Sequence, residues 1–237
     1  MTGCLYLLTL SQKITQDRIR YMKYLPLLGF FIYSTMFTQE AFGHPTSYEG
    51  GVALMSEFHP EIQELTLIYS PKYWLGTGVV SMRSPDKFEL VTSQVGWLVN
   101  RWNQPEAQGN FYLLGGIGHG KLEANGSTLE REGTIYRLGA QADFETRRIY
   151  TFLRYVEHRF TDGSDLLNNQ FAAAIGFAPY LGKFDELNSW VIFKMIASND
   201  FNDFIYLPMV RFFYKNFLWE LGQDFDGNSQ FNFMVRF

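Results

Sequence analysis

Bulky apolar and polar side chains alternate along the last nine residues of the chain, SQFNFMVRF. One parity holds Ser229, Phe231, Phe233, Val235 and Phe237, and the other holds Gln230, Asn232, Met234 and Arg236. Successive side chains of a β-strand point to opposite faces, so this pattern predicts a strand with one apolar face and one mostly polar face. The last residues of a soluble domain usually fray. A regular terminal strand is therefore a first indication of a sheet that closes on itself.

The same period of two recurs from residue 44 to residue 237, and no window shows a convincing helical period. Turn residues divide this region into segments that we expect to be strands: residues 51–58, 62–69, 72–83, 88–102, 110–122, 133–145, 147–160, 169–181, 188–198, 203–215, 217–225 and 229–237. Strands that cross a bilayer at a tilt need about nine to eleven residues, and an even number closes an antiparallel barrel. We predict one all-β domain, a closed antiparallel transmembrane β-barrel of about 12 strands, with 10 or 8 as alternatives.

Parity within a segment predicts which side chains face outward. In residues 203–215 the outward set is Phe204, Tyr206, Pro208, Val210, Phe212 and Tyr214. In residues 169–181 it is Phe171, Ala173, Ile175, Phe177, Pro179 and Leu181. Proline cannot donate a hydrogen bond to a sheet ladder, so we expect these two prolines to mark bulges or strand ends.

Composition supports a membrane barrel over a helical membrane protein. Aromatic residues make up 18% of the chain, with 23 Phe, 14 Tyr and 5 Trp, which calls for a large aromatic-lined surface. The mean hydropathy of −0.13 excludes several helical spans of about twenty apolar residues but permits alternating strands. The net charge is −4 without a basic run, so we expect no nucleic-acid partner. The single cysteine, Cys4, allows no intramolecular disulfide.

The first 43 residues have the pattern of a targeting segment. From Met22 the sequence MKYLPLLGFFIYSTMFTQEAFG has one lysine, then an apolar run that is too short to span a bilayer. Small residues at the −3 and −1 positions, Ala41 and Gly43, suit signal peptidase. We predict that residues 1–43 are an upstream extension plus a secretory signal peptide, and that residues 44–237 are the barrel. A buried core helix is the alternative, which the proline and glycine in the run disfavour.

The alternating Phe231, Phe233, Val235 and Phe237 resemble the C-terminal signature of bacterial outer-membrane β-barrel proteins, which the barrel-assembly machinery reads on the last strand. The resemblance implies localisation in the bacterial outer membrane, with outer-membrane lipid and the barrel-assembly machinery as partners. The sequence matches no named porin, protease or lipase family. A soluble β-sandwich that ends on phenylalanine is the alternative, and it leaves the aromatic excess unexplained.

Connection lengths give a second, weaker indication of a barrel. If both ends of the barrel domain are periplasmic, the two longest connections, residues 123–132 and 161–168, fall on the outside. Long outer loops and short periplasmic turns are typical of outer-membrane barrels. Residues 103–109 are long for a periplasmic turn.

Ionisable residues gather on the inward parity: Glu57, Glu64, Arg137, Asp143, Arg148, Arg154, His158, Lys194, Arg211, Glu220 and Arg236. Charges of both signs either pair into a plug or line a water-filled pore, and a lumen of twelve strands is wide enough for both outcomes. The arginines on the later strands indicate a preference for anionic solutes.

Two sets of residues are weak candidates for chemistry. His158, Ser164 and Asp165 lie near one predicted outer rim, as in barrel lipases and deacylases, but their spacing matches no compact serine hydrolase arrangement. His44 would become the new N-terminus after cleavage and could bind copper, but the other histidines are scattered. The glycine-rich LLGGIGHGK lacks the spacing of a phosphate-binding loop. We expect no cofactor and no metal.

The sequence therefore predicts a passive small-solute pore or a structural surface barrel, rather than an enzyme. An outer-membrane rim enzyme that acts on lipid is one alternative. A surface barrel that binds or adheres through its loops is another.

Overall fold

The computed structural model describes residues 44–237 except 125–129, 163–165, 184 and 202. The predicted signal segment, residues 1–43, lies outside the described residues, as do Ser164 and Asp165. Among the described residues no helix is long and apolar enough to cross a membrane. These residues form the strands β1 (Val52–His59), β2 (Ile62–Lys72), β3 (Leu75–Ser84), β4 (Phe88–Gln104), β5 (Ala107–Leu122), β6 (Arg131–Thr146), β7 (Ile149–Phe160), β8 (Leu166–Phe177), β9 (Asn188–Ser198), β10 (Ile205–Tyr214), β11 (Phe217–Gln223) and β12 (Ser229–Arg236).

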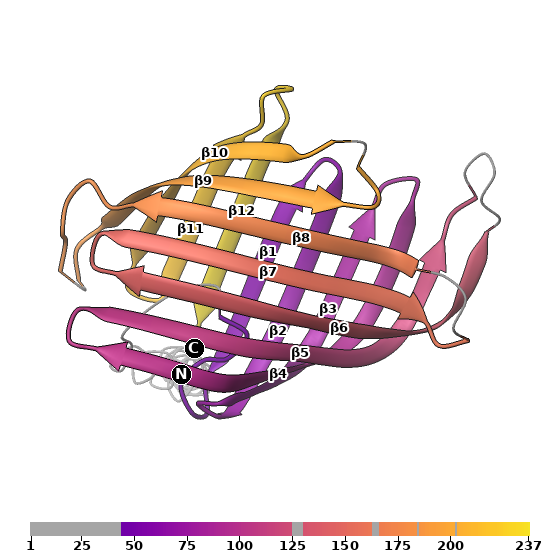
Figure 1. Cartoon of the computed structure of the whole chain (residues 1–237), viewed down its shortest axis with the longest axis horizontal. Coiled ribbons are helices and arrows are strands. Elements are labelled where there is room, and N and C mark those ends of the chain that lie inside the picture. Colours follow the sequence, from indigo (N-terminus) through magenta and orange to yellow (C-terminus); the bar gives the residue numbers. More distant parts are fainter. Residues whose placement is uncertain (1–43, 125–129, 163–165, 184, 202) are drawn as a thin grey trace, which may run out of the picture. The chain divides into compact units, whose positions relative to one another are not determined.

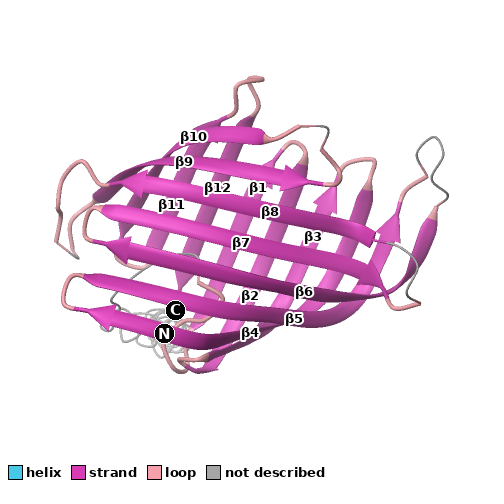
Figure 2. Cartoon of the chain, in the orientation of Figure 1, coloured by secondary structure: helices cyan, strands magenta, loops and turns pink. Residues whose placement is uncertain are grey.

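The strands form one closed barrel in which each strand pairs antiparallel with its neighbours in sequence (Figure 2). The pairing of β1 with β12, from Ala53 opposite Arg236 to Phe58 opposite Phe231, closes the barrel. Closure removes both exposed sheet edges, which is the reason that the terminal strand is regular to its end. The predicted fold class, a closed antiparallel barrel of twelve strands, is confirmed.

Two walls of the barrel cross one another in projection (Figure 1). Strands β5 to β8 form the near wall and run across the view, while β1 to β3, β11 and β12 form the far wall and run steeply. In the order of the barrel, β7 is six strands away from β1, and β9 is six strands away from β3. Side chains from these strand pairs therefore meet only if they reach across the full width of the lumen.

Alternation separates the inside of the barrel from its outside. Apolar side chains such as Leu67, Val91, Ile117, Leu153 and Ile175 are exposed on the outside, with Ile117 60% exposed. Their neighbours in the strands are buried inside. The predicted outward sets of β8 and β10 are on the outside as expected, although Phe171, Ala173 and Phe212 are only partly exposed.

The two prolines lie where a missing donor does little harm. Pro179 follows the end of β8, as predicted. Pro208 lies inside β10 without a register shift to β9, where it faces Phe193. The ladder between β10 and β11 begins one residue later, at Met209. Pro208 therefore marks the end of one ladder rather than a bulge.

The barrel has a loop end and a turn end. The loop end carries residues 60–61, 85–87, 123–130, 161–165, 199–204 and 224–228. The turn end carries residues 73–74, 105–106, 147–148, 178–187 and 215–216, and the chain enters β1 there. The longest connection, residues 178–187, lies at the turn end, so the expectation that the two longest connections share the other end is wrong. Because β8 stops at Phe177, residues 178–181 belong to this connection instead of a strand.

The inside of the barrel is layered along its axis. At the loop end the inward side chains of β2, β3, β4, β6, β7 and β8 form an apolar cluster: Ile62, Met82, Phe88, Leu90, Ile135, Phe160 and Leu167. We call this cluster the apolar layer. Phe201, from the connection between β9 and β10, packs against it from above. Deeper in the lumen, polar and charged side chains lie beside a second apolar cluster, which extends to the turn end: Tyr150, Ala178, Trp190, Ile192, Ile196, Leu207 and Met209.

Candidate functional site in the lumen

Seven charged side chains line one cavity of about 130 Å³ in the middle of the lumen: Glu57, Glu64, Arg137, Arg154, Lys194, Arg211 and Glu220. We call this set the charged layer. All seven belong to the predicted inward set. Each of them belongs to a different strand. All seven lie at inward positions, because every second residue of a strand faces the lumen.

Opposite charges are segregated to opposite parts of the wall. The carboxylates come from β1, β2 and β11, and the cations come from β6, β7, β9 and β10. Lys194 Nζ donates to Glu57 Oε1 across the lumen. Arg154 Nη2 lies 3.5 Å from Glu57 Oε2, and Arg154 Nη1 lies 3.9 Å from Glu64 Oε1. These ion pairs join strands up to six positions apart and therefore brace the barrel across its width.

Hydrogen bonds between neighbouring strands hold two of the carboxylates in place. Arg211 Nε donates to Glu220 Oε1 at 2.6 Å, and Asn232 Nδ2 donates to Glu220 Oε2 at 2.6 Å. Gln230 Nε2 donates to Glu57 Oε1 at 3.0 Å. Buried charges need such partners, because desolvation without compensation is costly. The described cavity is therefore a small space inside a largely paired network.

Arg148 is the exception among the predicted lumen residues. It lies in the two-residue turn between β6 and β7 and is exposed. The prediction extended the inward parity of β7 past the end of the strand, which begins at Ile149. The placement of Arg148 in the lumen is therefore wrong.

Asp143 lies inside the barrel but outside the charged layer, closer to the turn end. Asn110 Nδ2 donates to Asp143 Oδ1 at 2.7 Å, and His44 Nδ1 lies 3.2 Å from Asp143 Oδ2. Arg236, which shares the inward parity of β12, is also buried. Asp143 is thus part of the closure of the turn end.

Residues 44–47, which precede β1, are buried. A Cβ on Gly76 would lie 2.2 Å from the carbonyl oxygen of Pro45, and a Cβ on Gly96 would lie 2.9 Å from it. Gly76 and Gly96 face one another in the register of β3 and β4. Only glycine leaves room for this close approach. Residues 44–47 therefore pack inside the barrel and do not form an exposed tail.

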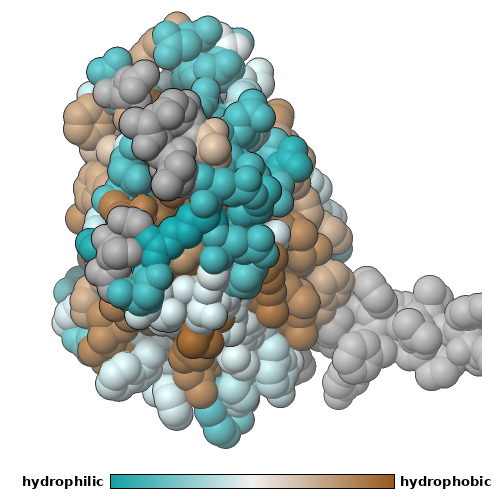
Figure 3. Space-filling view, turned by 90° about the vertical axis from the view of Figure 1, so that its right-hand side faces the viewer, coloured by the Kyte–Doolittle hydropathy of each residue, from teal (hydrophilic) through white to brown (hydrophobic). Residues whose placement is uncertain are grey.

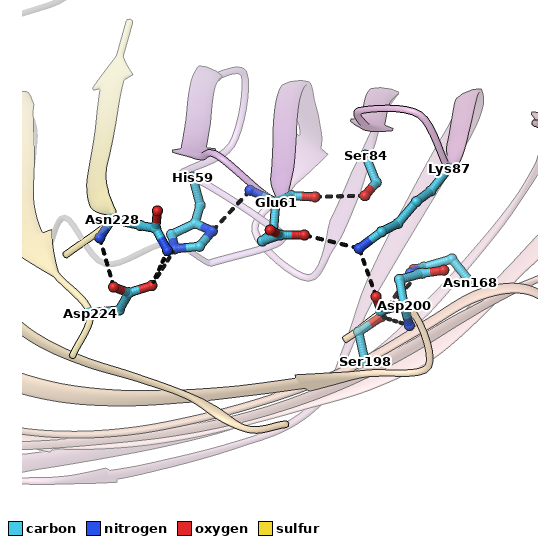
Figure 4. A network of polar contacts seen from close by, with 9 residues as sticks. All are labelled: His59, Glu61, Ser84, Lys87, Asn168, Ser198, Asp200, Asp224 and Asn228. Carbon is cyan, nitrogen blue, oxygen red and sulfur yellow. Dashed lines mark hydrogen bonds and ion pairs between the residues drawn. The ribbon is translucent and has the colours of Figure 1, made fainter. Parts of the chain in front are cut away.

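A polar network spans the loop end (Figure 4). Lys87 Nζ donates to Glu61 Oε2 at 2.9 Å and to the carbonyl oxygen of Asp200 at 2.8 Å. The connections that carry Lys87 and Asp200 belong to strands on opposite sides of the barrel. Asn168 Nδ2 donates to the Asp200 carboxylate and to Ser198 Oγ. Burial raises the pKa of Asp200, although the bonds from Asn168 and Ser198 and the charge of Lys87 oppose the shift.

The view in Figure 3 faces the loop end of β6 to β8 and shows hydrophilic residues across its middle, with hydrophobic residues on its flanks.

Asp224, in the connection between β11 and β12, accepts hydrogen bonds from the backbone N–H groups of Asp226 and Asn228 at 2.9 and 2.7 Å. Burial favours a higher pKa for Asp224, but these bonds and those from the Asn228 and His59 side chains outweigh it and lower the pKa.

Neither of two buried histidines in the barrel, His158 and His59, has the geometry of a catalytic base, which needs a free nitrogen beside a nucleophile. His158 is fully buried, and its Nε2 lies 2.9 Å from Arg137 Nη1. His59 accepts the backbone N–H of Glu61 on Nδ1 at 3.2 Å and faces Asp224 Oδ2 with Nε2 at 3.3 Å. Both nitrogens of His59 are occupied, and His158 is sealed from lipid and water. Neither has a serine partner among the described hydrogen bonds.

The described residues contain no group of three His, Cys, Asp or Glu side chains that could hold a metal ion. His44 has Asp143 as its neighbouring carboxylate, and its ring lies 5.8 Å from that of Tyr112. A copper site at His44 therefore lacks a third ligand of these types within the described part of the chain.

Two parts of the site were missed in the sequence. The apolar layer went unnoticed because an inward apolar residue on an alternating strand looks like part of a soluble core. The burial of residues 44–47 was missed too, although the sequence contains an indication of it. Gly76 and Gly96 leave space at inward positions of two neighbouring strands.

No protein family model matches this sequence, and no curated protein matches it. Solved structures with a similar chain include "KdgM porin in complex with disordered oligogalacturonate", with 11% identity, a TM-score of 0.45, and coverage of 79% of this chain and 98% of that chain. "Crystal structure of Acinetobacter baumannii OccAB4" has 13% identity, a TM-score of 0.33, and coverage of 74% and 52%. An OmpT loop-deletion mutant, described as an outer membrane protein of Vibrio cholerae, has 9% identity, a TM-score of 0.31, and coverage of 79% and 97%. These values assign the chain to none of the three.

Proposed function

We propose that this protein is a bacterial outer-membrane β-barrel that passes small polar solutes through its lumen. The observation that carries the proposal is the contrast between an apolar exterior and a charged lumen in one closed barrel. A soluble barrel would bury its apolar side chains inside and expose polar ones to water. A transmembrane barrel reverses this arrangement over the height of the membrane.

The exterior supports insertion in a membrane. Exposed apolar side chains occur on every strand, and Val79, Val95, Leu138, Val191 and Leu221 are typical examples. Closed barrels satisfy every backbone hydrogen bond between strands, which lipid requires. Exposed aromatic side chains accompany the strand ends: Tyr69, Tyr73, Trp74, Trp102, Phe177, Phe204, Tyr206, Phe217 and Trp219. Such residues suit the two interfaces between lipid and water. Outer-membrane lipid and the barrel-assembly machinery are accordingly the partners that we propose.

Side chains occupy both ends of the lumen in the described part of the chain. Residues 44–47 fill the turn end, and the apolar layer with Phe201 fills the loop end. We infer that solutes pass when the connection that carries Phe201 moves outward. Lys87 holds this connection through the Asp200 carbonyl and lies 5.6 Å from the centre of the Phe201 ring. The described conformation is then the closed state of a gated pore.

Single-channel recording in a planar bilayer tests the proposal directly. Purified protein, shown to be folded by heat-modifiable gel mobility, should give discrete current steps. The double variant Lys87→Ala, Phe201→Ala should be open for a larger fraction of the time, because it loses both contacts that hold the loop inward. A folded barrel without current steps in either form would contradict the pore.

The alternatives are supported less well. A rim enzyme requires a reactive histidine, and His158 is buried against Arg137. Adhesion through the loops concerns in part residues 125–129 and 163–165, which lie outside the described residues. The pore is therefore the function that the described geometry supports best.

A further inference from the structure

Arg137 differs from the other three cations of the charged layer. Each of the others has a carboxylate within 4.0 Å. Arg137 is only 2% exposed, and no carboxylate of the described residues lies within that distance of its guanidinium. Its hydrogen-bond partner is the Nε2 atom of His158, at 2.9 Å.

His158 cannot neutralise this arginine. An arginine only donates hydrogen bonds, so Nε2 of His158 must be the acceptor and carry no proton. The imidazole is then neutral. The Nε atom of Arg137 is buried without a hydrogen-bond partner among the described residues. A buried cation whose hydrogen-bond partner is neutral depends on nearby carboxylates. Glu64 acts on Arg137 electrostatically, but it is shared with Arg154.

A count of the charges around the cavity gives a surplus of one positive charge. The cavity is lined by four cationic side chains, from Arg and Lys, and by three carboxylates, from Glu. Asp143, on the same strand as Arg137, is engaged by His44 and Asn110 and does not line the cavity. One monovalent anion in the cavity would bring the charge of this layer to zero.

The cavity also limits the size and the chemistry of such an anion. A volume of about 130 Å³ corresponds to roughly four water molecules in the liquid, which allows one small organic ion. The planar guanidinium fork matches a carboxylate better than it matches a spherical ion. Apolar side chains complete the lining: Leu114, Phe152, Ala174, Ile192 and Met209. These residues suit a short alkyl chain.

We propose that the central cavity binds one short-chain monocarboxylate, with its carboxylate on Arg137 and its alkyl chain against the apolar lining. As a statement about which solute the barrel passes, this inference rests on the proposed function. As a statement about a binding site, it is independent of conduction.

Equilibrium dialysis with radiolabelled propionate tests the site on the full chain, expressed with its own leader and purified from membranes in detergent. Dialysis is continued until binding is constant, because side chains occupy both ends of the lumen. We expect saturable binding of one propionate per chain. Arg137→Gln should weaken binding by about tenfold or more, since a hydrogen-bonded charge is lost. Arg148→Gln removes an exposed arginine from a turn and serves as the matched control, with unchanged binding.

A second variant keeps the test decisive if Arg137→Gln does not fold. Glu64→Gln raises the surplus of the charged layer from one positive charge to two, so propionate should bind more tightly. The absence of saturable binding, equal binding by the Arg137→Gln barrel, or weaker binding by the Glu64→Gln barrel would overturn the proposal. Competition by sodium chloride as strong as that by unlabelled propionate would overturn the carboxylate assignment. A barrel that binds propionate without conducting would contradict the pore alone, and a barrel that conducts without binding would contradict the site alone.

Discussion

The charged layer and the apolar layer both fill the width of the same barrel, but they do so by different forces. In the charged layer, Glu57 on β1 meets Arg154 on β7, six strands away. In the apolar layer, Phe88 and Phe160 pack in a cluster that also includes Leu167. Ion pairs are directional and lose most of their value when one partner is removed, whereas apolar packing loses free energy in proportion to the volume deleted. The charged layer is therefore suited to select a solute, and the apolar layer is suited to seal the lumen.

The strongest test of this comparison is Glu57→Gln. It removes the shared carboxylate of Lys194 and Arg154 and leaves two cations without that partner. We expect a loss of about 3 to 5 kcal/mol in the free energy of unfolding, as for one member of a buried ion pair. Urea unfolding of the barrel in lipid vesicles, followed by tryptophan fluorescence, measures it. Glu49→Gln breaks the exposed pair with Lys72 and should change stability by less than about 1 kcal/mol. Equal effects of the two variants would refute the buried network.

Leu167→Ala probes the apolar layer in the same unfolding assay. Leu167 is 1% exposed within the cluster. Its truncation should cost about 2 to 4 kcal/mol through lost burial and the cavity left behind. The loss should be the same at low and high salt, because no charge is involved. A marked salt dependence of this loss would show that the stability of the apolar layer is coupled to the ion pairs of the charged layer.

Phe201→Ala, as a single variant, separates sealing from stability. Phe201 packs on the apolar layer from a connection outside the strands, so the barrel should lose only about 1 kcal/mol, at the low end of the range for truncated apolar side chains. The fraction of time in the conducting state should nevertheless rise in single-channel records. Phe225→Ala is a matched control, since Phe225 is 76% exposed at the same end. An identical change in gating by both variants would rule out a specific role for Phe201.

The smallest expected effect is a pH dependence at the loop end. The folded state lowers the pKa of Asp224, so this group adds stability above its unfolded pKa of about 3.9 and loses it as the pH falls through the lower folded value. Proteolysis of the connection between β11 and β12 should therefore accelerate below about pH 4. Pepsin gives the rate below pH 4 and thermolysin gives it at pH 6, and an unstructured peptide of the same sequence corrects for the activity of each protease. Asp224→Asn should be cut faster at pH 6 and lose most of the acid dependence. If the variant keeps the full acid dependence, another group is responsible.

Part of the site could be predicted from the sequence alone. The residues that were placed wrongly or not predicted at all have one cause in common. Parity predicted that Glu220 and Lys194 face inward, and both lie on regular strands and line the central cavity. The same rule failed for Arg148, where the strand had already ended. It also gave no information on Phe201, which reaches the lumen from a connection and not from a strand. A periodic rule holds only where the backbone is periodic.

The sequence by itself determined the twelve strands and the face on which most of their side chains lie, because side-chain direction in a strand is a local property with a period of two. Only the tertiary structure decided which of these side chains meet. Glu57 and Arg154 are 97 positions apart in sequence, and their contact depends on the closure of the barrel and the stagger of its strands. The same is true of Arg137, which has no carboxylate within 4.0 Å among the described residues, because this follows only from the places of all the other side chains. Pairing across a lumen is a property of the closed barrel and has no counterpart in the pattern of any single strand.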